Sequence, residues 1–274
     1  MQLRSRLITK YKAVGLEGIF RALRHRVSRK LSGVEDVGTQ HILISRRLSA
    51  LFNSTVAYGP FAGTKLSSEI RWGAGDRGSM LLGIYEKEVI EFLATFGDGR
   101  RTFIDIGAAD GYYAIGCVKS GLFKKSICFE ISEIGQKIIK RNAALNLIEE
   151  KIEVHGEADF AVLQKIPIEV RDACVLLIDI EGAEFDFITA DLLRKFVNAF
   201  IVIEVHDNFV ADGSERYKKL YDLCSEHFNC TEVRTGARDL SQYKELEFFP
   251  DHDRWLICSE SRRRLGKWLF LEPK

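Results

Sequence analysis

The sequence lacks several features that would assign it to a membrane, a nucleic acid or a disulfide-stabilised class. No apolar run in the 274 residues approaches the ~18 residues that cross a bilayer, and charges interrupt the N-terminus too often for a signal peptide. Lys and Arg number 40 against 39 Asp and Glu, so no global field attracts nucleic acid. The six cysteines form no CxxC pair, which favours reduced, buried thiols and a cytoplasmic protein.

A regular spacing of polar residues organises the middle of the chain. Each one ends a short apolar run, and they recur about every 25 positions: Asp105, Glu130, His155, Asp179 and Glu204. A parallel strand with its return helix occupies about this length. Parallel strands that are buried on both faces have continuous apolar sequences. We therefore predict an α/β sheet with strands at 102–105, 126–130, 151–155, 174–179 and 200–204. Ligands of such sheets bind beyond the carboxyl ends of the strands, where these polar side chains lie.

The flanking segments give weaker patterns. Helical spacing predicts a helix after Glu130, with Ile134, Ile138 and Leu145 on one face, and another after Glu204. Segments 228–233 and 254–258 predict two further strands. Residues 34–80 have weak periodicity and many turn residues, so we expect an irregular segment that covers the ligand edge. Residues 82–96 predict a helix that ends at Gly97.

The first 33 residues carry nine Lys or Arg against one acid, Glu17, together with an apolar stripe at helical spacing. Such a basic amphipathic helix can rest on an anionic membrane surface, here the inner membrane face, or dock on its own protein. The sequence leaves both alternatives open.

The turn after the first predicted strand reads Asp105-Ile106-Gly107-Ala108-Ala109-Asp110-Gly111. The GxGxxG fingerprint of nicotinamide-dependent oxidoreductases is absent, which disfavours that class. A carboxylate at this strand end suits a cationic ligand better than a pyrophosphate. Glu130, at the end of the second strand, is placed to accept hydrogen bonds from ribose hydroxyls.

Two pairs of polar residues follow the fourth and fifth predicted strands. Asp179 with Glu181, and Glu204 with His206, stand two residues apart, so each pair shares a face and can project into one cleft. His206, with a usual pKa of about 6.5, is the predicted general base, oriented by Glu204 or Glu181. Two alternatives remain: a cap of the next segment by His206 and Asp207, or Mg²⁺ or Ca²⁺ bound by Asp179, Glu181 and Asp207.

Three segments closely resemble the FkbM family of S-adenosylmethionine-dependent methyltransferases. They are FIDIGAADGYY at 103–113, LLIDIEGAEFDFI at 176–188 and IVIEVHD at 201–207. The resemblance extends to YGPFAG at 58–63, LLGIYEKEV at 81–89 and RWLICSESRR at 254–263. Ala109 departs from the family, which often has asparagine there.

The resemblance implies a Rossmann-like class I methyltransferase fold, a seven-stranded, mostly parallel sheet with helices on both faces and one antiparallel strand. From the resemblance together with the pattern along the chain, we predict an N-terminal extension, 1–97, before an S-adenosylmethionine-binding catalytic domain, 98–274. The resemblance also implies O-methylation of a hydroxyl on a sugar, glycan or secondary metabolite. The catalytic residues that the strand-end pairs predict for this reaction are Asp179, Glu181, Glu204 and His206. The implied cofactor-binding residues are Asp105, Gly107, Ala108 and Gly111 for the methionine part, Glu130 for the ribose, and Glu157 with Ala158 for the adenine.

Other activities are less consistent with the residues. Many enzymes that methylate bases carry an Asn/Asp-Pro-Pro-aromatic turn after the fourth strand, whereas this chain has Asp179-Ile180-Glu181-Gly182. We therefore expect a small-molecule or glycan acceptor and no nucleic acid partner. Candidate acceptor contacts are Tyr58, Trp72, Tyr85 and His252. The remaining alternatives are a non-catalytic Rossmann-like binding module with a membrane-surface N-terminal helix, and an NAD(P)-dependent oxidoreductase.

Overall fold

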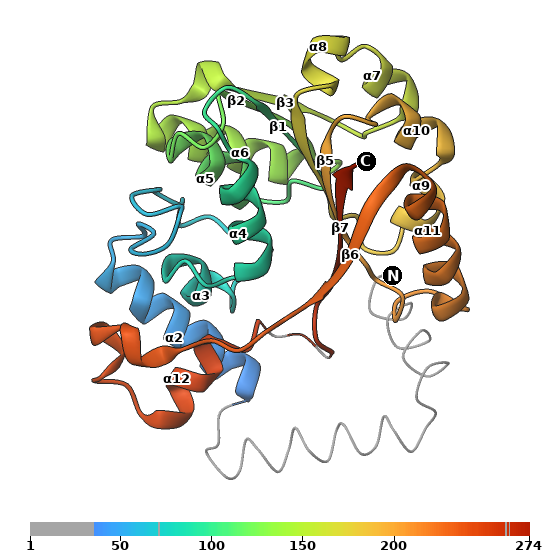
Figure 1. Ribbon diagram of the computed structural model, residues 1–274. Helices are drawn as coiled ribbons and strands as arrows, with labels where there is room; N and C mark the ends of the chain where they lie inside the picture. Colours follow the sequence, from blue (N-terminus) through green and yellow to red (C-terminus); the bar gives the residue numbers. More distant parts are fainter. Residues whose placement is uncertain (1–35, 71, 261, 263) are drawn as a thin grey trace, which may run out of the picture.

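The computed structural model describes residues 36–70, 72–260, 262 and 264–274 (Figure 1). The basic helix predicted for residues 1–33 lies outside the described residues. None of the helices in the described ranges is long and apolar enough to span a membrane.

A seven-stranded sheet forms the centre of the molecule. Its strands are β1 Thr102–Ile106, β2 Lys125–Phe129, β3 Ile152–His155, β4 Cys174–Ile178, β5 Phe200–Glu204, β6 Phe228–Arg234 and β7 Lys267–Pro273. Their order is β3-β2-β1-β4-β5-β7-β6. Strand β7 runs antiparallel to both β5 and β6, whereas β1 to β5 pair in parallel. This order, with one reversed strand, confirms the predicted Rossmann-like fold of the class I methyltransferase type.

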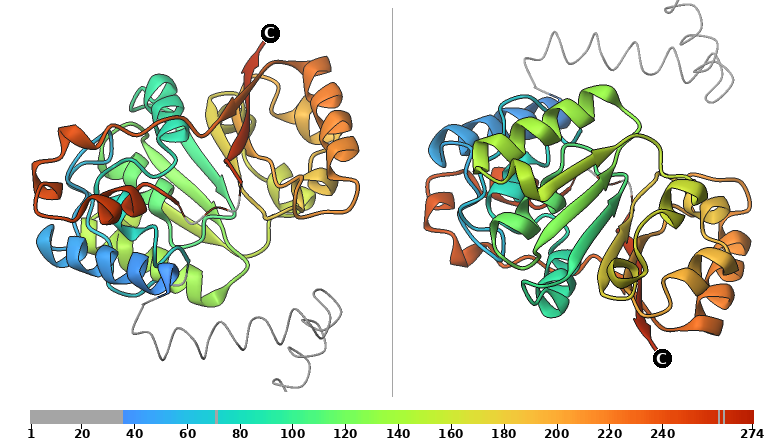
Figure 2. Two further views of the ribbon diagram at one scale, coloured as in Figure 1. Left: turned by 90° about the horizontal axis from the view of Figure 1, so that it is seen from below. Right: turned by 90° about the horizontal axis from the view of Figure 1, so that it is seen from above.

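Helices cover both faces of the sheet (Figures 1 and 2). They are α2 Val37–Leu51, α3 Arg77–Leu81, α4 Lys87–Phe96, α5 Tyr112–Lys119, α6 Glu133–Asn146, α7 Phe160–Gln164, α8 Ile168–Arg171, α9 Glu184–Phe187, α10 Ala190–Lys195, α11 Gly213–His227 and α12 Asp251–Ile257. Alternate strand residues enter two cores, with Phe103 on the face of α2 to α6 and Ile104 on the face of α7 to α11. Continuous apolar runs were therefore the correct signal, because both faces of each central strand are buried.

The prediction of a strand at 254–258 is wrong. This segment belongs to α12, which follows Pro250, and its buried residues Asp253 and Ile257 stand four apart, as on one helix face. Short apolar runs do not separate strand from helix by periodicity alone. The last strand is instead β7, whose residues Trp268 to Leu271 are all buried. That four-residue apolar run was the signal for it.

The expectation that residues 34–80 are irregular is also wrong in part, because α2 is a regular helix. Its buried residues are His41, Ile44, Ser45 and Leu48. Two of these four are polar, which weakens the apolar periodicity in the sequence. Helix α2 lies beside α12 (Figure 1), and Gln40 Nε2 donates to Asp253 Oδ1 at 2.6 Å. The C-terminal segment therefore packs on the N-terminal extension.

Helix α6 exists as predicted, but its buried face differs. Ile134 and Leu145 are exposed, at 54% and 43% of their surface. The buried face includes Asn142, whose Oδ1 accepts a hydrogen bond from Ser67 N at 2.7 Å. Its Nδ2 donates to Asp110 O at 2.8 Å. A polar residue is buried here because it joins the extension to the turn after β1.

Candidate functional site

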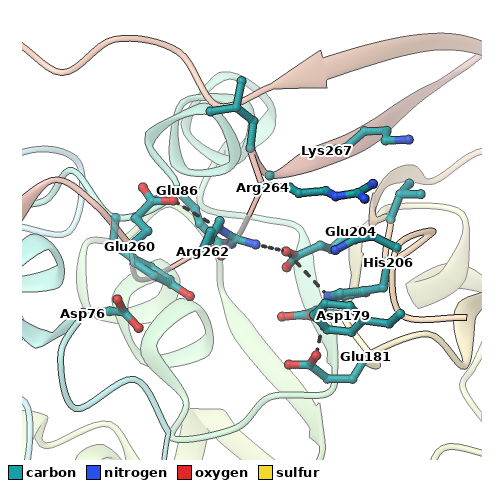
Figure 3. Close-up of a pocket in the computed structure, with 16 residues that line it drawn as sticks. Asp76, Glu86, Asp179, Glu181, Glu204, His206, Glu260, Arg262, Arg264 and Lys267 are labelled. Atoms are coloured by element: carbon teal, nitrogen blue, oxygen red, sulfur yellow. Dashed lines mark hydrogen bonds and ion pairs between the residues drawn. The ribbon is translucent and has the colours of Figure 1, made fainter. Parts of the chain in front are cut away.

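A cavity of about 510 Å³ lies at the carboxyl ends of β4 and β5. Figure 3 shows that four parts of the chain contribute charged side chains to its wall. These are Asp179, Glu181, Glu204 and His206 at the strand ends, Asp76 before α3, Glu86 before α4, and Glu260, Arg262, Arg264 and Lys267 before or at the start of β7. The structure thus brings both predicted pairs into one cavity.

His206 is the centre of this group. Its side chain is 8% exposed, and its Nε2 atom faces three carboxylates (Figure 3). Nε2 lies 3.6 Å from Asp179 Oδ1, 3.6 Å from Glu204 Oε1 and 3.8 Å from Glu181 Oε2. These distances exceed ordinary hydrogen bonds.

Glu184 orients His206 from the other side of the ring. The sequence analysis predicted this role for Glu204 or Glu181. Its Oε1 atom lies 3.4 Å from Nδ1 of His206 and accepts a hydrogen bond from the His206 backbone N–H at 2.7 Å. Its Oε2 atom accepts from Gly182 N at 2.8 Å. The side chain has no exposed surface, so this carboxylate fixes the loops after β4 and β5 relative to one another.

The pKa of His206 differs from the usual histidine value on which the prediction of a general base relied. Burial lowers the pKa of His206, but the neighbouring Glu184 and the charges of Glu204 and Glu181 outweigh it and raise the pKa above its usual value. Burial, and then the charges of Glu204 and Glu86, raise the pKa of Asp179 well above its usual range. The site therefore holds crowded carboxylates around an imidazole that is easily protonated.

Backbone strain positions Glu181. Its φ is 54°, in the left-handed region, and the next residue, Gly182, has φ 103°. A non-glycine residue in this region costs on the order of 1–2 kcal/mol, and such strain concentrates at functional sites. The strained turn brings the Glu181 carboxylate back toward His206.

Arg262 joins the extension to the sheet, and the sequence analysis gave it no role, although it lies in the segment RWLICSESRR at 254–263. Its guanidinium forms ion pairs with Glu86 and Glu204 (Figure 3), and its Nε atom lies 3.3 Å from Glu260 Oε2. Burial and the charge of Glu204 raise the pKa of Glu86 to about 8, although Arg262 opposes the shift. The positive charge of Arg262 thus lies among three glutamates that are only 2% to 5% exposed.

The turn after β1 lies directly behind the cavity. Gly107 has φ 89°, and a Cβ there would lie 1.7 Å from the carbonyl oxygen of Asp179, so only glycine fits. Asp105 is 2% exposed, and its Oδ2 atom has no hydrogen-bond partner. Burial and the charge of Glu130 raise the pKa of Asp105 to about 7, against the opposing N–H of Ala114.

Glu130 supports the same turn. Its Oε2 accepts from Ala109 N at 2.8 Å and its Oε1 from Ser132 N at 2.7 Å. Ala109 has φ 48°, in the left-handed region, which asparagine tolerates better than alanine. Glu130 is 6% exposed, and its ribose role stays a prediction.

The other predicted cofactor residues lie along the same edge. Ala108 is buried, and Gly111, with φ 79°, is the N-cap of α5. Glu157 is exposed and Ala158 half-buried in the loop after β3.

Of the candidate acceptor contacts, Tyr85 lines the cavity, whereas the hydroxyl of Tyr58 bonds to Glu245. Trp72 and His252 are exposed and are not part of the cavity wall.

Asp207 forms an ion pair with a lysine, and within the described ranges no ion pair joins it to His206. Its carboxylate pairs with Lys267 Nζ. Ligand atoms that lie within 4.8 Å of one another come instead from Asp179, Glu181 and His206. The candidate cation ligands in the structure are therefore Asp179, Glu181 and His206, whereas the sequence analysis named Asp207 as the third ligand.

Comparisons with known proteins give similarity in fold only. No family model and no curated protein matches the chain. The B. subtilis M1A22 tRNA methyltransferase is 14% identical with a TM-score of 0.42, covering 67% of this chain and 64% of that one. A precorrin-6y C5,15-methyltransferase from Geobacter metallireducens is 15% identical with a TM-score of 0.45, covering 70% and 90%. An O-methyltransferase from Bacillus cereus, crystallised with SAH, is 15% identical with a TM-score of 0.43, covering 90% and 96%.

Proposed function

We propose that this protein transfers a methyl group from S-adenosylmethionine to a hydroxyl of a sugar, glycan or secondary metabolite. The observation that carries the proposal is the contact between the turn after β1 and the cavity. Gly107 packs against the carbonyl of Asp179, and the side chain of Asp179 lines the cavity. A donor held by the turn would therefore stand next to an acceptor held in the cavity.

The residues of the turn fit a cationic, hydroxyl-bearing cofactor. Asp105 offers a buried carboxylate oxygen that lacks a partner, and such a group requires a ligand or water. Gly107, Ala108 and Gly111 would border the methionine part, and Glu130 the ribose. Glu157 and Ala158 would adjoin the adenine. When bound, S-adenosylmethionine supplies an electrophilic methyl group on a positively charged sulfur.

The cavity wall suits an acceptor with several hydroxyl groups. Carboxylates accept hydrogen bonds from hydroxyls, while Arg262, Arg264 and Lys267 donate to them. Methyl transfer to an alcohol needs removal of its proton, and the catalytic group for this is Asp179, Glu181, Glu204 and His206. Where no cation occupies this group, Nε2 of His206 is the proton acceptor, and the surrounding carboxylates stabilise the imidazolium.

Calorimetry with S-adenosylmethionine and with NADH tests the cofactor. We expect binding of S-adenosylmethionine, weakened by Asp105→Ala, and no binding of NADH. Preference for NADH would favour the oxidoreductase alternative, and no binding of either would favour the non-catalytic module.

The acceptor class is tested by mass spectrometry. Glycans and secreted metabolites from cells with and without the gene should differ by one methyl group. If the modified compound instead carries its methyl on a nitrogen, the assignment of a hydroxyl acceptor is wrong.

A further inference from the structure

We infer that Asp179, Glu181 and Nε2 of His206 bind one divalent transition-metal ion, such as Mn²⁺, Fe²⁺ or Zn²⁺, in the wall of the cavity. The binding site stands on its own geometry, while its use in methyl transfer rests on the proposed function. An ion there would hold and polarise the acceptor's hydroxyl oxygen, and His206 would then act as a ligand.

The ligand atoms of the three side chains all lie within 4.8 Å of one another. Ligand atoms about 2.1 Å from one ion, at angles of about 110–120°, stand about 3.4–3.6 Å apart. Nε2 of His206 lies 3.6 Å from Asp179 Oδ1 and 3.8 Å from Glu181 Oε2. These atoms are too far apart for good hydrogen bonds and need only small shifts to surround an ion.

The imidazole is aimed into this group by its Nε2 atom, which lies 3.6 Å or more from each of the surrounding carboxylate oxygens. The side chain of His206 is 92% buried, since 8% is exposed. Asp179 Oδ1 is a buried oxygen without a hydrogen-bond partner. Buried polar atoms without partners are rare and indicate a missing ligand, water or ion.

The charges around the group leave an excess of negative charge. Arg262 pairs with Glu204, and two backbone N–H groups bond to Glu184. Within the described ranges, no ion pair joins Asp179 or Glu181 to a Lys or Arg, and both carboxylates lie beside the imidazole. When both are ionised, the charge of the two carboxylates matches that of a divalent cation.

The surroundings of His206 are those of a metal ligand. A ligating histidine usually presents its other ring nitrogen to a carboxylate, which fixes the ring. Glu184 Oε1 lies 3.4 Å from Nδ1 and is fully buried. A nitrogen ligand with two carboxylates favours Mn²⁺, Fe²⁺ or Zn²⁺ over Mg²⁺ or Ca²⁺, which prefer oxygen ligands.

Titration of the full-length, EDTA-treated protein with MnCl₂ tests the site without donor or acceptor. We expect one Mn²⁺ per chain and a pulsed electron paramagnetic resonance spectrum with coupling to a histidine nitrogen. His206→Ala should remove this coupling, and Glu181→Gln should weaken Mn²⁺ binding about tenfold or more. Glu181 has an exposed side chain, at 66%, so its variant should keep the native fold.

Asp207→Asn is the matched control, because Asp207 neighbours the group but pairs with Lys267. It should leave the Mn²⁺ affinity unchanged. The inference is overturned if wild-type protein does not bind Mn²⁺, if nitrogen coupling is absent, or if Asp207→Asn weakens binding while Glu181→Gln does not. Failure of the proposed function would appear instead as an absence of S-adenosylmethionine binding, which the Mn²⁺ titration does not measure.

Discussion

Glu184 Oε1 lies 3.4 Å from Nδ1 of His206, and the Glu184 side chain is completely buried. The same carboxylate accepts hydrogen bonds from the backbone N–H groups of Gly182 and His206. One side chain therefore fixes both the ring of His206 and the two loops that form the floor of the cavity.

Replacing Glu184 by Gln should destabilise the protein by about 1–3 kcal/mol, because one end of the amide is a donor and leaves a buried N–H without an acceptor. Urea denaturation measures the change. Glu181→Gln is the control and should stay within about 0.5 kcal/mol of wild type, since Glu181 is exposed. Equal stability of the two variants would contradict this role for Glu184.

Arg262→Met should destabilise the fold by about 3–5 kcal/mol, because it leaves the buried carboxylates of Glu86 and Glu204 without their positive partner. Arg264→Met removes an exposed guanidinium from the same cavity wall and should change stability by no more than about 0.5 kcal/mol. Thermal unfolding of both variants provides the comparison. A small effect of Arg262→Met would mean that the ion pairs contribute little to folding.

Affinity for S-adenosylmethionine should rise with pH through about 7. The raised pKa of Asp105, about 7, means that its carboxyl becomes charged only in this range, and a cationic ligand prefers the charged form. Asp105→Asn should bind more weakly and lose this dependence. Calorimetry between pH 6 and pH 8, in steps, checks the slope, and an identical slope in both proteins would exclude Asp105 as its source.

The same shift affects stability in a defined pH window. Asp105 ionises near 3.8 when unfolded and near 7 when folded, so between these values the native state binds more protons. The contribution of Asp105 to stability is therefore present in full below pH 3.8 and is lost as pH rises toward 7. Denaturation curves across this window should show a steeper decline for wild type than for Asp105→Asn.

Ala109→Gly should stabilise the protein by about 1 kcal/mol, because Ala109 has φ 48° and glycine adopts this conformation without strain. Its N–H bond to Glu130 is retained. Ala144→Gly in the exposed part of α6 should have the opposite sign, with a loss of about 0.8–1.0 kcal/mol. Two losses of similar size would show that Ala109 is not strained in solution.

The sequence predicted β1 to β5 because each is a continuous apolar run that ends in a polar residue, and both features are local. It also predicted that Asp179, Glu181, Glu204 and His206 share one edge, since residues two apart on a strand point the same way. It did not predict the helical state of 254–258, because the buried residues of α12 include Asp253. It missed α2 for a related reason, the polar residues His41 and Ser45 on the buried face.

The sequence by itself determined the positions and parallel order of β1 to β5 and the set of polar residues at the ligand edge, because the burial of these strands and the alternation of their side chains follow a regular pattern along the chain. Only the tertiary structure decided which charged groups meet. Glu184 reaches His206 across 22 positions, and Arg262 reaches Glu204 across 58. Such contacts depend on how separate loops pack against the sheet, and loop packing leaves no periodic pattern along the chain.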